Sequence, residues 1–145
     1  MVQMGRLRPY SLIALLLALT SCGDTQAPTG RWEGFIESPT WAIAVRLQVD
    51  EGNVIRASAL SANIDGMSLP AKFEAERQLK TALKEGWPKA VRGQVDFHDD
   101  TMTRTGGVAP LFVFEPRSRT MTFYFYAGGK LTEKVVCLPV EQFPS

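Results

Sequence analysis

Apolar and polar residues alternate with a period of two through most of the chain after residue 30. Between positions 41 and 49 every odd position carries a large apolar side chain, whereas Arg46 and Gln48 fall on the other parity. Successive side chains of a β-strand point to opposite faces, so this pattern predicts a strand that is buried on one face. Asp50–Asn53 supplies turn residues, and a second alternating run follows, which predicts a hairpin.

The same alternation recurs in short runs that Gly and Pro interrupt. Such spacing is typical of an antiparallel sandwich or barrel. The sequence predicts about seven strands, at 31–37, 41–49, 54–62, 91–98, 111–115, 120–127 and 131–138.

Residues 71–86 break the pattern, because they are rich in strong helix formers at helical spacing. Ser68 is a capping residue, Pro70 suits the first turn, and Gly86 ends the run. We predict one helix of about 71–86, inserted between the third and fourth strands. Its lysines favour a solvated face, with contact to a membrane surface as the alternative.

Gly30-Arg31-Trp32-Glu33-Gly34 resembles the Gly-x-Trp motif that opens the first strand of lipocalin-like barrels. Much of residues 30–114 also resembles a small β-barrel module of secreted bacterial proteins, which often precedes an α/β-hydrolase domain. The likeness includes Gly66–Pro70, Val91–Gly93 and Gly106–Leu111. The resemblance implies an antiparallel lipocalin-like barrel or highly curved sheet with a binding or spacer role. It carries over no catalytic residue, and we expect no hydrolase domain after Ser145.

The first 22 residues have the layout of an export signal. Arg6 and Arg8 precede a compact apolar run, which is too short to favour a permanent membrane span. Leu19-Thr20-Ser21-Cys22 resembles the lipobox of bacterial lipoproteins, in which the cysteine is acylated and becomes the first mature residue. This resemblance implies that Cys22 is the lipidation site; ordinary secretion with an incidental cysteine is the alternative.

The predicted organisation is a lipoprotein signal peptide over 1–21, a flexible tether over 22–29 and a single β-rich domain over 30–145. Gly23, rather than an aspartate, follows the cysteine. By similarity to the sorting rule of Gram-negative lipoproteins, this favours the periplasmic face of the outer membrane in such a host.

Composition and motifs argue against several classes of function. A net charge of +1 gives no basic field for nucleic acid. His98 stands beside Asp99 and Asp100, which we interpret as an exposed acidic turn rather than a metal site or part of a hydrolytic triad. Cys137 lies among aliphatic residues, which favours a small buried apolar role over a reactive thiol. We expect no metal and no cofactor.

The strand over 121–126 is apolar on both faces, so it is either a core strand or an aromatic wall of a ligand pocket. The predicted function is therefore a non-enzymatic, membrane-anchored envelope lipoprotein that binds a small apolar ligand. An envelope protein-interaction module is the first alternative and a hydrolase the second. Candidate ligand-lining residues, chosen for size and face, are Trp32, Trp41, Phe112, Phe123 and Phe125.

Overall fold

The structure is a computed structural model that describes residues 26–144. The predicted signal peptide and the predicted lipidation site, Cys22, lie outside the described residues. Among the described residues, no helix has both the length and the apolar character needed to cross a bilayer.

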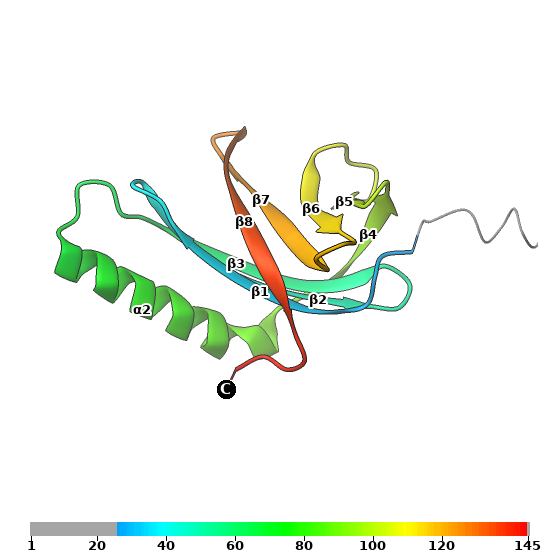
Figure 1. Ribbon diagram of the computed structural model, residues 1–145, viewed down its shortest axis with the longest axis horizontal. Coiled ribbons are helices and arrows are strands. Elements are labelled where there is room, and N and C mark those ends of the chain that lie inside the picture. Colours follow the sequence, from blue (N-terminus) through cyan, green and yellow to red (C-terminus); the bar gives the residue numbers. More distant parts are fainter. Residues whose placement is uncertain (1–25, 145) are drawn as a thin grey trace, which may run out of the picture.

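Eight antiparallel strands close into a barrel in the described part of the chain, and each strand pairs with its neighbours in sequence (Figure 1). The strands are β1 (Gly30–Glu37), β2 (Trp41–Asp50), β3 (Val54–Asn63), β4 (Arg92–His98), β5 (Thr101–Arg104), β6 (Pro110–Glu115), β7 (Thr120–Ala127) and β8 (Lys130–Val140). Pairing of β1 with β8, through Arg31, Trp32 and Glu33, completes the ring.

One α-helix, α2 (Leu69–Gly86), separates β3 from β4, and a short 3-10 helix, η1 (Trp87–Lys89), follows it. Ser68 caps the start of α2, because its hydroxyl oxygen accepts a hydrogen bond from the backbone N–H of Ala71. The prediction of an inserted helix is confirmed. It begins two residues earlier than position 71 because Leu69 and Pro70 form its first turn.

The sheet of β1, β2 and β3 has apolar packing on both faces. Its inner face points into the barrel, where Ile43, Val45 and Leu47 have no exposed surface. Its outer face packs against α2 through Ala42 and Ala44, which form a second core with helix and loop residues. The small alanine side chains let the helix approach the sheet closely, so β2 is buried on both sides.

The barrel is closed over only part of the length of its strands. β3 pairs with β2 over its whole length, but it pairs with β4 only through Val54, Ile55 and Arg56. Figure 1 shows the consequence: the far halves of β1, β2 and β3 project beyond the barrel, and α2 lies along this extension.

The predicted fold class is confirmed, with eight strands where about seven were expected. The additional strand is β5, which is four residues long and has one buried side chain, Met102. It follows a tight turn in which Asp99 and Asp100 both have positive φ, a conformation that Asn and Gly adopt most often. The short length and the unusual turn residues conceal this strand in the sequence.

Ala27, close to the start of the described residues, packs against the domain. This residue is 2% exposed, and its backbone N–H donates to the side-chain oxygen of Asn53 over 2.7 Å. The chain is therefore held at the β2–β3 turn, at the end of the molecule opposite the start of α2 (Figure 1).

Candidate functional site

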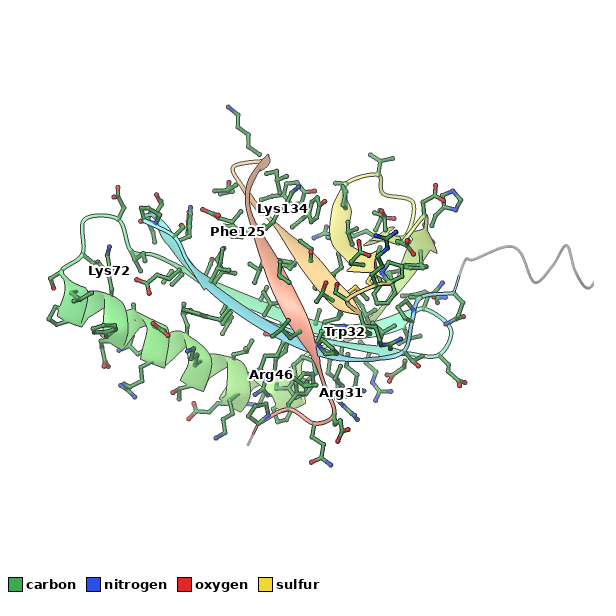
Figure 2. The ribbon with its side chains drawn as sticks, in the orientation of Figure 1. Arg31, Trp32, Arg46, Lys72, Phe125 and Lys134 are labelled. Atoms are coloured by element: carbon green, nitrogen blue, oxygen red, sulfur yellow. The ribbon has the colours of Figure 1, made fainter. Side chains whose placement is uncertain are left out.

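The five predicted ligand-lining residues lie together in the barrel core. Trp32 and Phe112 are almost fully buried, and Trp41, Phe123 and Phe125 pack against the same cluster. The ring centroids of Trp41 and Phe125 are 5.1 Å apart, and those of Phe112 and Phe123 are 5.2 Å apart. Figure 2 shows Trp32 near the closing strands and Phe125 further along the β7–β8 hairpin. These aromatic side chains fill space against one another.

Trp32 also has a specific polar contact. Its indole N–H donates to the backbone carbonyl of Arg119 over 2.8 Å, across the β6–β7 turn. A buried indole needs such a partner, so this bond fixes the orientation of the ring in the barrel core.

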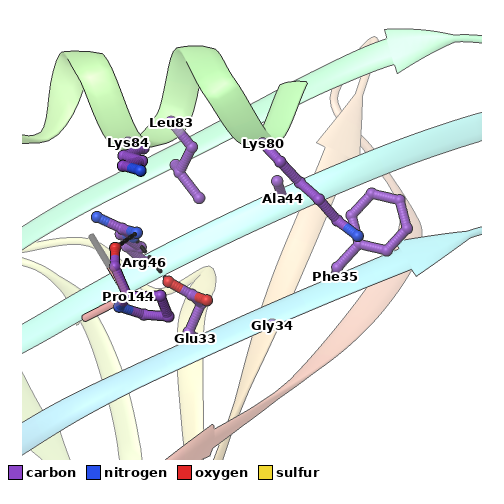
Figure 3. A pocket seen from close by; sticks show the side chains of 9 residues that line it. All are labelled: Glu33, Gly34, Phe35, Ala44, Arg46, Lys80, Leu83, Lys84 and Pro144. Carbon is purple, nitrogen blue, oxygen red and sulfur yellow. Dashed lines mark hydrogen bonds and ion pairs between the residues drawn. The ribbon is translucent and has the colours of Figure 1, made fainter. Parts of the chain in front are cut away.

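A cavity of about 380 Å³ lies on the other side of the sheet, between α2 and the outer face of β1 and β2 (Figure 3). This volume is at the lower end of the range for small-molecule sites, about 300–1,000 Å³. The lining comes from the strands, the helix and the C-terminal segment, namely Glu33, Gly34, Phe35, Ala44, Arg46, Lys80, Leu83, Lys84 and Pro144.

Arg46 forms one wall of this cavity. It is 5% exposed, and its Nε donates to a carboxylate oxygen of Glu33 over 2.7 Å. Its Nη2 donates to the carbonyl oxygen of Pro144 over 3.1 Å. A guanidinium removed from water needs partners of this kind, so strand and C-terminal segment together hold it in place.

Two lysines of α2 form the opposite wall. Lys80 and Lys84 are one helical turn apart, so both side chains leave the helix on the side that faces the sheet (Figure 3). Lys80 Nζ lies 4.5 Å from the centroid of the Phe35 ring and 2.8 Å from a carboxylate oxygen of Glu76. The cavity thus combines an apolar floor with cationic walls.

The C-terminal segment is attached to the sheet by aromatic and cationic side chains. Phe143 lies edge-on to Trp87, with ring centroids 4.8 Å apart. The Arg46 guanidinium lies 4.9 Å from the Phe143 ring centroid, and the Arg56 guanidinium lies 5.6 Å from the Trp87 ring centroid. These contacts place Pro144 at the edge of the cavity.

His98 ends β4, and Asp99 and Asp100 form the β4–β5 turn. The His98 and Asp99 side chains are 82% and 88% exposed, and His98 Nε2 lies 3.3 Å from an Asp99 carboxylate oxygen. The interpretation of an exposed acidic turn is confirmed. Across residues 26–144, no three His, Cys, Asp or Glu side chains come together in an arrangement that could hold a metal ion.

Cys137 is fully buried in the barrel core, as its aliphatic neighbours predict. Burial raises the pKa of its thiol to about 12, and the nearby Glu33 carboxylate acts in the same direction. At neutral pH the sulfur therefore stays protonated, which makes it a poor nucleophile.

Comparison with known proteins identifies no relative: no family model, no curated protein and no solved structure matches this chain.

Sequence reasoning placed the ligand on the inner face of the sheet and missed the outer face. Ala42, Ala44 and Arg46 occupy the even positions of β2, the side predicted to face solvent. Two alanines on that side are a signal that another element packs closely against it. Lys80 and Lys84 fall within the predicted helix, but their position over the sheet depends on how the helix packs.

Proposed function

We propose that this protein is a lipid-anchored, non-enzymatic lipoprotein of a bacterial envelope that binds a small, largely apolar ligand. The anchor is the acylated Cys22, and the binding site is the cavity between α2 and the sheet. This site lies outside the barrel, in contrast to the aromatic interior that the sequence first suggested.

One observation carries the binding proposal: the cavity has an apolar floor with a few convergent polar groups, the usual character of a small-molecule site. Phe35, Ala44 and Leu83 supply the apolar surface, whereas Arg46 supplies a fixed donor. The anchor proposal rests on the signal-like layout of residues 1–22 and on Leu19-Thr20-Ser21-Cys22.

Metabolic labelling with palmitate tests the anchor. The intact chain is expected to incorporate the label, and Cys22→Ala is expected to abolish it. Cys137→Ala is the matched control, because it removes the buried cysteine and should leave labelling unchanged. Label that persists in Cys22→Ala, or no label in the intact chain, would refute the anchor.

A thermal-shift screen of lipids and small apolar metabolites tests the binding site. A ligand that binds only the folded state should raise the Tm by several degrees. Phe35→Ala removes part of the cavity floor and should reduce the shift, whereas Phe73→Ala removes an exposed ring outside the cavity and should not. If no compound stabilises the protein, the proposal that it binds a small apolar ligand is wrong.

The alternative is a protein-interaction module, and a different surface favours it. Met67, Leu69 and Phe73 are 40%, 62% and 60% exposed around the start of α2. Clustered exposed apolar side chains are typical of contact surfaces between proteins. Under this alternative, Phe73→Ala would weaken partner capture while Phe35→Ala would leave it intact, which is the reverse of the pattern for the ligand.

A further inference from the structure

From the charge of the cavity we infer the class of ligand: a single-chain amphiphile with an anionic head group. Its chain would lie on Phe35 and Leu83, and its head between Lys84 and Arg46. This inference rests on the proposed function and extends it from an apolar ligand to one with a defined charge.

The apolar surface of the cavity suits one chain. Phe35 comes from β1, Ala44 from β2 and Leu83 from α2, so the floor and roof belong to different elements that the second core holds together. A cavity of about 380 Å³ is small for a ligand with two long chains.

The walls carry an excess of positive charge. Arg46, Lys80 and Lys84 line the cavity together with one carboxylate, that of Glu33. Glu76, which pairs with Lys80, adds a second carboxylate nearby, so cations still outnumber carboxylates. A cationic head group would be repelled by this positive charge, whereas a carboxylate head group would gain charge-assisted hydrogen bonds.

Lys84 is the residue best placed to select the head group. It lies near the C-terminal end of α2, beside Arg46 and Pro144 in Figure 3. Arg46 already donates to Glu33 and to Pro144, and Lys80 already contacts Glu76. An arriving carboxylate can therefore be held by the Lys84 ammonium without breaking the ion pairs that stabilise the fold.

The test uses the full chain in membranes and three photoreactive probes that share a ten-carbon chain. The probes are decanoate, decanol and decyltrimethylammonium, each with a diazirine near the chain end. After illumination, mass spectrometry locates the label on the peptides that contain Phe35, Ala44 and Leu83. Mapping by position separates binding in the cavity from partition into the bilayer.

Decanoate is expected to label the cavity peptides more strongly than decanol, and decyltrimethylammonium to label them least. Lys84→Gln should reduce decanoate labelling by about tenfold, the loss expected for one charge-assisted hydrogen bond. Lys72→Gln is the matched control, because Lys72 belongs to the same helix and does not line the cavity.

The outcomes separate the two proposals. Equal labelling by all three probes, or an unchanged decanoate signal in Lys84→Gln, would overturn the anionic head group and leave a general apolar site. Absence of cavity labelling by every probe would overturn ligand binding at this site as well. Preferential labelling by decyltrimethylammonium would reverse the charge assignment.

Discussion

Gly34 and Cys137 meet where β8 closes onto β1, and the space between them admits no further atom. A Cβ at position 34 would lie 2.8 Å from both Cys137 Sγ and the Val136 carbonyl oxygen. Neither neighbour can easily move away, because Cys137 Sγ is fully buried and Val136 contributes a backbone atom. The absence of a side chain at Gly34 is what permits barrel closure at this point.

We therefore expect Gly34→Ala to lower the free energy of unfolding by about 1–3 kcal/mol, as overpacking of a filled core does. Gly93→Ala is the control: Gly93 also lies in a strand, but a Cβ there meets nothing within 4 Å. Its effect should stay within about 0.5 kcal/mol. Urea unfolding of both variants measures the difference, and equal losses would show that closure does not depend on this contact.

The buried Cys137 thiol makes stability depend on pH in the alkaline range. Burial raises its pKa to about 12, whereas the same thiol in the unfolded chain titrates near 9. Between these values the unfolded state binds fewer protons, so stability falls as pH rises, by up to about 1.4 kcal/mol per pH unit. Below the unfolded pKa this contribution is fully present.

Cys137→Ala removes this titration and keeps every other ionisable group. Urea unfolding between about pH 8 and pH 11 should show a steeper decline for the original chain than for the variant. The variant is less stable at pH 8 because it loses buried volume, so the comparison concerns the slope rather than the absolute value. Parallel declines would mean that Cys137 ionises equally easily in both states.

At the level of elements, alternation predicts which side of each strand faces the barrel, and the structure agrees for β2. The same rule fails for the opposite side of β2, which is predicted to face solvent because it contains Arg46 and Gln48. Packing by α2 turns that side into a second core with a cavity beside it. Periodicity describes one strand at a time, so the placement of a helix over the sheet could not be read from it.

The C-terminal segment contributes one edge of the cavity, through Pro144. Phe143 lies between Arg46 and Trp87 and thereby holds Pro144 at the cavity edge. Since the ring is half-buried, Phe143→Ala should cost less than the about 3–5 kcal/mol that a fully buried phenylalanine contributes. Carboxypeptidase digestion should remove the last residues faster in this variant.

Gln142→Ala provides the comparison, because the neighbouring glutamine is exposed and should have little effect on digestion. If both variants are digested at the rate of the original chain, then the aromatic contact does not hold the segment. Faster digestion without a change in ligand binding would show that Pro144 is dispensable for the cavity.

At the level of the whole molecule, the position of Ala27 relates the fold to the proposed anchor. Ala27 is fixed to the β2–β3 turn through Asn53. The five peptide units from Cys22 to Ala27 span at most about 18 Å, whatever their conformation. If Cys22 carries the lipid, the β2–β3 turn must stay close to the membrane, and the start of α2, at the other end of the molecule, points away (Figure 1).

Fluorescence quenching from the bilayer measures this orientation. Glu51→Cys places a label on the β2–β3 turn, and Asp65→Cys places one in the loop before α2; both positions are exposed. Cys137 is buried and protonated, and Cys22 would be acylated, so the introduced cysteine takes the label. In the lipidated protein reconstituted into vesicles, a quencher attached to the lipid head groups should quench the Glu51→Cys label more strongly. Equal quenching would show that the domain lies flat or tumbles freely, so that the start of α2 also comes close to the membrane.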